Sequence, residues 1–412
     1  MSIDVKMAWR NLWRNPRRSI LTIAAIAFAS LLLVFMLSWQ FGSYETMIDS
    51  SVRIHTGHLQ VQAEGYQDKK SMRLVVSDPA AVGNVLDKNP EVAAYTYRAN
   101  AFSLVSSKER TYGVIVVGID PDREAKVSTL KKLIRQGSYL SENETDQALV
   151  GELLARNLQI GVGDELVVLG QGRDGSIAAT VVTVRGIYRS GMDEFDRSSI
   201  QIPLAYFQDV YNMRGAVHEV VVLGKSLKYV PEIKKTVAAD IKGIKNKEAL
   251  VDLDWMELMP GLIEAIKMDL YSGFIFYIIL IIVVAFSILN TFLMTIFERT
   301  KEFGVLMAIG TTPGRLCKLL MIESTIMTIA GIIAGIILGS LVTWYFQVHG
   351  IFISGTSELM RQFGLPERIY PQLSLLSASI GPAAVLVITF LTALYPALKV
   401  WRFRPVEAMA GK

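Results

Sequence analysis

Reactive side chains are scarce in this sequence. Its 412 residues include one cysteine, Cys317, so no intramolecular disulfide can form. There are four histidines, and neither an H-E-x-x-H nor a G-x-S-x-G sequence occurs. No G-x-x-x-x-G-K-[ST] sequence occurs either, which excludes an ATP-binding P-loop in this chain. We find no catalytic constellation and expect a non-enzymatic chain without a metal or cofactor of its own.

Neither acidic nor basic residues are in large excess, because the net charge is only +4. Such a small excess gives no reason to expect a nucleic-acid partner. The composition is instead apolar, with 51% hydrophobic residues and 19% charged residues. This mixture predicts several membrane spans together with a water-exposed portion.

Four charge-free windows are long enough to cross a bilayer as helices, which takes about 20 apolar residues. We expect spans at residues 19–41, 271–297, 319–346 and 373–398. The first follows basic residues and contains Ala27-Phe28-Ala29, as a cleaved signal peptide would. Because the apolar run continues directly beyond these residues, a retained anchor helix is the better interpretation.

Lysine and arginine cluster in three of the short segments outside the spans, namely 1–18, 298–318 and 399–412. The short segment 347–372 has only Arg361 and Arg368, offset by Glu358 and Glu367. The positive-inside rule then predicts cytoplasmic termini, a cytoplasmic 298–318 and an extracytoplasmic 347–372. Residues 42–270 would lie outside the cytoplasm.

Residues 42–270 are enough chain for one or two compact domains. Five β-branched runs predict strands, at 58–63, 112–118, 165–169, 179–187 and 217–223, with a hairpin connection at 170–176. Helices are expected at 78–88, 151–158 and 230–241, which gives an α+β domain. A β-rich insert at about 111–224 and a helical stalk at 255–270 complete the predicted organisation.

Two polar clusters in this domain receive the plainer of two interpretations. His55 and His58 lie three apart on an extended segment and would face opposite sides, so we expect surface histidines rather than metal ligands. Asp193, Glu194 and Asp196 could bind a cation, but a solvated turn is favoured.

Charged residues are missing from the centres of all four spans, which disfavours a polar pathway between them. Glu298 and Glu323 lie at span ends, where we expect their side chains to snorkel toward water. Gly331, Gly335 and Gly339 share one face of the third span and form a surface for close helix packing. The neighbouring helix could belong to this chain or to a second copy.

The stretch ERTKEFGVLMAIGTTPGRL at 298–316 is charged and joins the second and third spans. We expect the second span to continue as helix to about Ile309, where Gly310 ends it. Thr312 then caps a new helix with Pro313 at its first position. Such an elbow could transmit a push from a cytoplasmic partner. On spacing alone, a simple connector with topogenic basic residues is the favoured alternative.

Several segments together resemble the FtsX-like permeases, the membrane subunits of ABC transporters of the macrolide-exporter (MacB) and lipoprotein-releasing (LolC/LolE) type. The resemblance is carried by 298–339, by MAWRNLWRNPRRSILT at 7–22, by 148–169 and 182–204, and by YPALKVWRFRPVEAM at 395–409. It therefore covers essentially the whole chain. It implies a four-span α-helical region in the bacterial inner membrane, with a large α+β periplasmic domain inserted between spans 1 and 2.

The resemblance also implies function and partners. A separate ATPase would bind ATP and grip the elbow, and the segment that matches the family's coupling region assigns this role to Glu298, Arg299, Glu302, Gly304, Gly310 and Pro313. The permease would pair with a second copy or a paralogue, contact membrane lipids, and move its periplasmic domains without passing solute through the membrane centre.

The substrate is less closely defined. The SGMDEFD stretch and the lack of a fused ATPase favour lipoprotein release, with lipoproteins and a periplasmic chaperone as partners. The chaperone-docking excursion of LolC-type subunits is short here, as LGQGRDGSIAAT at 169–180. A LolE-like role, export of another amphipathic substrate, and regulation of a cell-wall hydrolase as by FtsX-like activators all stay open.

Overall fold

The structure is a computed structural model that describes residues 3–141, 145–352 and 368–401. The chain folds into two compact units. We call residues 1–44, 266–352 and 368–412 the helical unit, and residues 45–265 the sheet domain. Most of the predicted segments 347–372 and 399–412, including Arg361 and the residues from 402 onward, lie outside the described residues.

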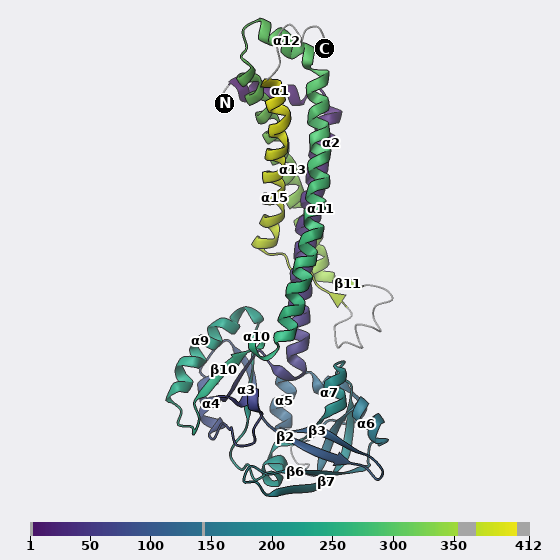
Figure 1. Cartoon of the computed structure of the whole chain (residues 1–412), viewed down its shortest axis with the longest axis vertical. Helices are drawn as coiled ribbons and strands as arrows, with labels where there is room; N and C mark the ends of the chain where they lie inside the picture. The colour runs from purple at the N-terminus through teal and green to yellow at the C-terminus, as the bar shows by residue number, and fades with distance from the viewer. Residues whose placement is uncertain (1–2, 142–144, 353–367, 402–412) are drawn as a thin grey trace. The chain divides into compact units, whose positions relative to one another are not determined.

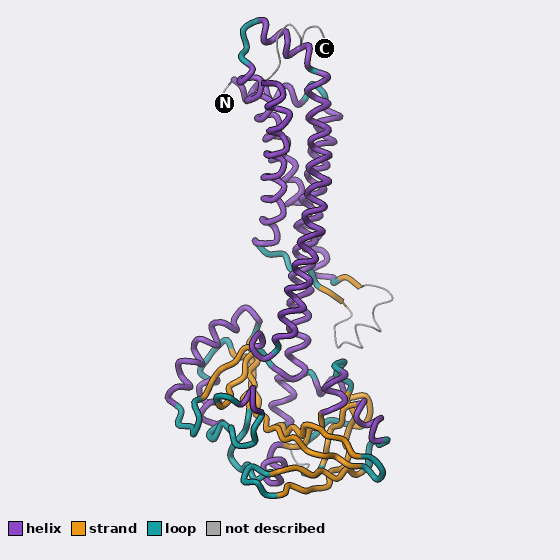
Figure 2. The backbone as a smooth tube through the Cα atoms, in the orientation of Figure 1, coloured by secondary structure: helices purple, strands orange, loops and turns teal. Residues whose placement is uncertain are grey.

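The helical unit contains long helices and one two-stranded pairing (Figures 1 and 2). The strands β11 (Ile351–Phe352) and β12 (Arg368–Ile369) pair antiparallel. The helices are α1 (Ile3–Leu12), α2 (Pro16–Ser51), α11 (Pro260–Glu298), α12 (Thr300–Ala308), α13 (Pro313–His349) and α15 (Leu375–Trp401). The first residues of α11 and the last of α2 belong to the sheet domain.

Four of the helices, α2, α11, α13 and α15, are long and apolar enough to cross a membrane. Buried side chains from all four, including Ile26, Ile288, Met327 and Val385, meet in one cluster. Each span therefore has one face against the other helices and one face exposed.

The sheet domain is built on ten strands in the order β10-β1-β9-β2-β3-β8-β5-β7-β4, with β6 pairing to both β2 and β7. The strands are β1 (Leu59–Ala63), β2 (Val92–Ser106), β3 (Thr111–Ile119), β4 (Ile134–Gly137), β5 (Gln147–Gly151), β6 (Glu165–Gln171), β7 (Ile177–Tyr188), β8 (Ser199–Pro203), β9 (Glu219–Gly224) and β10 (Leu250–Asp254). All five predicted strands are present. The turn at 170–176 joins β6 to β7, with the Gly172 N–H donating to the Ser176 carbonyl at 2.9 Å.

Short helices cover this sheet. The three that the sequence predicts begin and end within two residues of the predicted ranges, as α4 (Pro79–Leu86), α6 (Glu152–Leu158) and α9 (Val230–Asp240). The others are α3 (Tyr66–Lys69), α5 (Pro121–Val127), α7 (Asp193–Ser198), α8 (Leu204–Val210), α10 (Trp255–Leu258) and the 3-10 turns η2 (Leu130–Leu133), η3 (Leu227–Tyr229) and η4 (Ile241–Gly243). A π-helical turn, η1 (Val52–Thr56), follows α2 directly.

The two largest hydrophobic cores of the sheet domain lie on this one continuous sheet. The first contains Val61, Val82 and Val222 and is covered by α4 and α9. The second contains Val116, Leu154 and Val182 and already includes Ala99 and Ala101 of β2, before the predicted insert boundary at 111. The strand β2 is shared between the two cores because it pairs first with β9 and then with β3. The predicted fold class is confirmed as four candidate spans and a large α+β domain between the first two.

Candidate functional site

The elbow between the second and third spans consists of α12 and the turn that follows it. Gly310 has φ +105°, a left-handed conformation that favours glycine, and its N–H donates to the Met307 carbonyl at 3.0 Å. Thr312 occupies the N-cap position of α13 and Pro313 follows in the first turn. Thr312 makes no side-chain capping bond, so Pro313 and the extended conformation of Thr312 set the start of α13.

The predicted continuous helix from the second span to Ile309 is wrong. The helix α11 ends at Glu298, and Arg299 departs from helical geometry with φ −99° and ψ 7° before α12 begins. The break allows the Arg299 guanidinium to reach both Glu302, at 3.4 Å, and Glu323, at 3.3 Å.

One face of α12 is buried against the neighbouring helices. Phe303 and Met307 pack with Ile296 of α11 and with Leu316 and Leu320 of α13. Because α11, α12 and α13 share this small core, a displacement of α12 will act on both adjoining spans.

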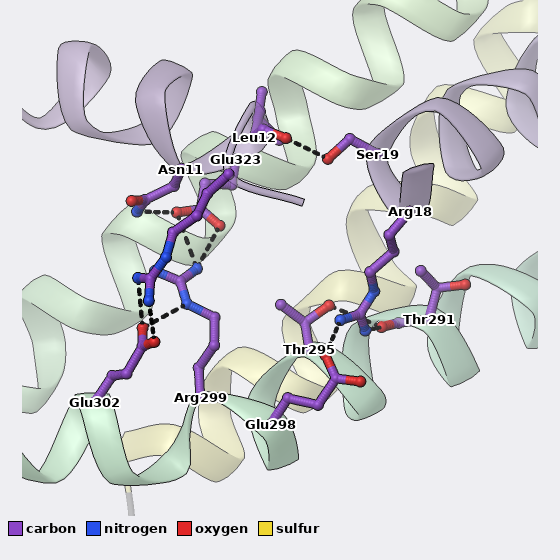
Figure 3. A network of polar contacts seen from close by, with 11 residues as sticks. Asn11, Leu12, Arg18, Ser19, Thr291, Thr295, Glu298, Arg299, Glu302 and Glu323 are labelled. Atoms are coloured by element: carbon purple, nitrogen blue, oxygen red, sulfur yellow. Dashed lines mark hydrogen bonds and ion pairs between the residues drawn. The ribbon is translucent and has the colours of Figure 1, made fainter. Parts of the chain in front are cut away.

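Two arginines of the N-terminal segment bind the elbow through ion pairs (Figure 3). Arg14 makes a bidentate contact with Glu302, at 2.9 and 2.5 Å. Arg18, at the start of α2, contacts Glu298 at 2.7 Å and also donates to the Thr291 carbonyl. Arg14 lies in the turn between α1 and α2, and Glu302 lies on α12 beyond the break at Arg299, so the two ion pairs join different elements.

Glu323 of α13 is a buried acceptor in this network. It is only 5% exposed, accepts from the Asn11 side-chain amide at 2.6 Å, and faces Arg299. The expectation that it snorkels to water is therefore wrong, because a buried carboxylate is held by partners instead. Glu298 stays about half exposed beside Arg18.

The helix α1 is further fixed to the start of α13. Asp4 contacts Arg315 at 3.3 Å and Lys318 at 3.4 Å. Ala8 and Leu12 are buried on the same helix, whereas Trp9 and Trp13 are exposed. The N-terminal helix, the elbow and the start of α13 thus form one charged and apolar junction.

The electrostatics of the elbow favour ionised Glu302. Its partial burial would raise the pKa, but hydrogen bonds and charges from Arg14 and Arg299 outweigh this and hold the pKa below its ordinary value. Glu302 therefore carries its negative charge at neutral pH.

The six residues predicted to couple to an ATPase take different places in this junction. Glu298, Arg299 and Glu302 are engaged with partners in the same chain, Gly304 is buried, and Gly310 and Pro313 shape the turn. Two apolar side chains of the elbow face outward instead, Val305 at 49% and Ile309 at 79% exposure. Sequence reasoning missed these two, as well as Asn11, Arg14 and Arg18.

The three glycines of α13 pack against α2 of the same chain. A Cβ at Gly331 would lie 2.8 Å from the Cβ of Ile26, and one at Gly335 would lie 2.5 Å from the Ala27 carbonyl oxygen. A Cβ at Gly339 would lie 3.1 Å from the Cα of Leu31. The structure thus answers the question left open by the sequence, because the close neighbour is α2.

Two predictions for the sheet domain are wrong. His58 is buried, with its Nδ1 accepting from the Gly224 N–H at 3.1 Å, and His55 is half-buried in η1, so neither is a plain surface histidine. The acidic stretch is the helix α7 rather than a solvated turn, and Asp196 is buried and accepts from the Ser190 N–H at 2.9 Å. Within the described ranges, no group of three His, Cys, Asp or Glu residues is placed to hold a metal ion.

Comparisons with known proteins match both parts of the chain. The model of the MacB-like periplasmic core domain matches residues 19–239, and that of the FtsX-like permease C-terminal region matches residues 274–405.

Individual relatives agree with these family models. The chain is 25% identical to the lipoprotein-releasing system transmembrane protein LolC of Xylella fastidiosa, over 95% of this chain and 93% of that protein. It is 22% identical to the macrolide export ATP-binding/permease protein MacB of Nitrosomonas europaea, over 99% of this chain and 59% of that longer protein. The crystal structure of the periplasmic region of MacB from Actinobacillus actinomycetemcomitans aligns with 52% of this chain, at 16% identity and a TM-score of 0.38. The MacB-like core-domain model covers more than half of the chain and the FtsX-like model covers its C-terminal part, so the chain belongs to the FtsX-like ABC transporter permeases of the MacB/LolC type.

Proposed function

We propose that this chain couples ATP hydrolysis by a separate ATPase subunit to movement of the sheet domain on the periplasmic side of the inner membrane. The substrate we propose is lipoproteins, which would be released toward the outer membrane. The observation that carries the proposal is the elbow, where α12 packs against α11 and α13 and its Glu302 pairs with Arg14 in the turn between α1 and α2.

The exposed side of the elbow supports a docking role. Val305 and Ile309 present apolar surface next to Lys301 and Gly310, which are also exposed. An apolar anchor surrounded by polar groups is the usual composition of a protein–protein contact. Beneath it, Glu302 of α12 pairs with Arg14 in the turn between α1 and α2, and Glu298 at the end of α11 pairs with Arg18 of α2. A force on the exposed side would therefore reach the spans.

The interior of the helical unit supports movement rather than solute passage. Among its described residues, the buried charged side chain is Glu323, which is bound by Asn11 and Arg299 at the elbow end of α13. Membrane pathways for polar solutes are lined by ionisable groups or broken helices at mid-depth. A machine that moves its periplasmic domains needs neither.

Similarity to LolC along nearly the whole chain supports lipoproteins as the substrate. Similarity to MacB over 99% of this chain supports export of another amphipathic molecule as the second candidate. Both candidates require a cytoplasmic ATPase, a second permease subunit and the same orientation, with termini and elbow in the cytoplasm.

The test is to purify the tagged chain from its native membrane in mild detergent and to identify co-purifying proteins by mass spectrometry. We expect an ATP-binding-cassette subunit with the parent chain and its loss with Glu302→Lys and Gly310→Pro. The matched control is Glu109→Lys, a charge reversal at an exposed position of the sheet domain. Co-purified lipoproteins would favour lipoprotein release. Absence of any ATPase from the parent preparation would refute the proposed function.

A further inference from the structure

The end of α2 is bound unusually firmly within the sheet domain. The last carbonyl groups of a helix lack partners inside the helix and are commonly left to water. Here α2 continues into the π-turn η1, where three successive carbonyls accept hydrogen bonds from elsewhere in the domain. The Thr129 N–H donates to Arg53 at 2.9 Å, the Ser128 hydroxyl donates to Ile54 at 3.1 Å, and the Arg98 guanidinium donates to His55.

We call these hydrogen bonds between η1 and the rest of the sheet domain the joint. Arg98 is its central donor and is fully buried. Its side chain is 1% exposed and forms two hydrogen bonds with Glu124 of α5, at 3.0 and 2.6 Å, where Glu124 is 2% exposed. A bidentate arginine–carboxylate contact fixes the orientation of both groups. The remaining guanidinium nitrogen is therefore aimed at the end of α2 and cannot move without exposing a buried charge.

The position of Arg98 in the sheet connects the joint to both halves of the sheet domain. Arg98 is the residue at which β2 passes between its two partners, since it pairs with Glu219 of β9 and with Ile119 of β3. The two hydrophobic cores of the sheet domain meet along this strand. A side chain anchored there connects the end of α2 to both cores.

The acidic helix α7 completes the joint from the other side. Phe195 places its ring 5.1 Å from the His55 ring and 5.6 Å from the Tyr188 ring, measured between centroids. Asp196, next along α7, accepts from the Ser190 N–H and holds the helix against the end of β7. The SGMDEFD stretch thus packs Phe195 against His55 of η1 and uses Asp196 to hold α7 in place.

We infer that Arg98, held by Glu124 and assisted by Ser128, Thr129 and Phe195, is the positioning residue that makes the end of α2 and the sheet move as one body. This inference deepens the proposed function and rests on it, because it names the point where motion of α2 is delivered to the periplasmic domain. A helix that ended in a free loop could turn without moving the sheet. The joint removes that freedom.

The test uses two spin labels within the sheet domain of the full-length chain in lipid nanodiscs. With Cys317→Ser as background, cysteines replace Ser50 on α2 and Ala179 on β7, and their distance is measured by electron–electron resonance. We expect one narrow distance that stays unchanged when the co-purified ATPase binds ATP. In Arg98→Lys, one ammonium cannot hold Glu124 bidentately and still reach His55, so the distribution should broaden. Ser128→Ala, which removes one donor only, should broaden it less.

The matched control is Val182→Ala, which weakens the second core at a buried position whose apolar side chain takes no part in the hydrogen bonds to η1. It should lower the thermal unfolding midpoint while the distance stays narrow. Two results would overturn the inference: an unchanged narrow distance in both Arg98→Lys and Ser128→Ala, or a parent distance that itself shifts with ATP. The nucleotide-free comparison needs no ATPase, so failure of the joint and failure of the proposed function remain distinguishable.

Discussion

Helix α2 is held at its two ends by arginine–glutamate contacts of opposite character. At the elbow end, Arg14 and Glu302 are 62% and 38% exposed, and Arg18 and Glu298 are also in reach of water. At the sheet-domain end, Arg98 and Glu124 are almost completely buried. Water and salt weaken exposed pairs, whereas buried pairs cannot be broken without a large penalty.

This difference indicates two kinds of junction on one helix. Exposed pairs can separate and re-form at little cost, as a contact that changes with a partner's nucleotide state must do. A buried bidentate pair keeps one geometry and suits the transfer of motion. Under the proposed function, the elbow end would be the adjustable junction and the sheet-domain end the fixed one.

The largest expected effect is at the fixed end. Arg98→Met would leave Glu124 buried without its partner and the His55 carbonyl without its donor, and should cost about 3–5 kcal/mol of stability. We expect a marked fall in the thermal unfolding midpoint of the purified chain, followed by far-ultraviolet circular dichroism. The paired control Arg98→Met with Glu124→Leu should recover part of the loss, since no charge is then stranded. A cost below about 1 kcal/mol would remove the distinction between the two ends.

Lowering the pH should also reduce the free energy of unfolding of the sheet domain. Burial is the main cause that lowers the pKa of His218 to about 4, from an ordinary value of 6.5. Its contribution is fully present above pH 6.5 and is lost as pH falls toward 4, by up to about 3 kcal/mol. Thermal unfolding should thus become steeply pH-dependent in this window.

The backbone N–H of Asn100 donates to the His218 ring at 2.9 Å. A glutamine side chain can accept the same hydrogen bond but does not titrate, so His218→Gln is the matched variant. It should flatten the pH dependence between 6.5 and 4. An equally steep profile in this variant would assign the acid sensitivity to other groups.

Between its two ends, α2 depends on close packing with α13. Gly335→Leu would place side-chain atoms where the Ala27 carbonyl and Ser30 already lie, 2.5 Å from the position of a Cβ. Such overpacking costs about 1–3 kcal/mol. The expected result is less monodisperse protein after heating in detergent, measured by fluorescence-detected gel filtration. Gly261→Ala on α11 is the control, because no atom lies within 4 Å of its added Cβ.

The smallest effect on stability is expected at the adjustable end. Arg14→Gln removes one exposed pair and should cost less than about 1 kcal/mol, with a difference that shrinks further in high salt. The measurement is the unfolding midpoint in low and high salt beside the parent chain. A loss as large as that of Arg98→Met would contradict the assignment of the two junctions.

Local pattern was sufficient to predict the spans, five strands and the longer helices, because each carries a clear apolar period and boundary residues. It missed the strand β2, whose polar and small residues hide its alternation. The break at Arg299 was also missed. It depends on contacts with Glu302 and Glu323, and a 24-residue separation leaves no local signal for the second.

The location of the site along the chain could be predicted from the sequence, but the contacts of its residues could not. The elbow was located from its glycines, proline and charges, yet its charged residues turned out to bind one another and the N-terminal segment. Both intervals, Arg14 to Arg18 and Glu298 to Glu302, cross a helix break, so a helical spacing rule could not have found that pairing. The burial of His58 and Asp196 and the partial burial of His55 depend on tertiary packing, which no short pattern reveals.

The most direct test of the account is the rate of ATP hydrolysis by the purified complex when the exposed side of the elbow is changed. Ile309→Asp alters the 79% exposed side chain of the elbow, and Ile177→Asp makes the same change at an 81% exposed position of the sheet domain. We predict that Ile309→Asp loses the ATPase subunit and the hydrolysis it supplies, while Ile177→Asp keeps both. Unaltered hydrolysis and an intact complex in Ile309→Asp would contradict docking at the elbow and the route of force built on it.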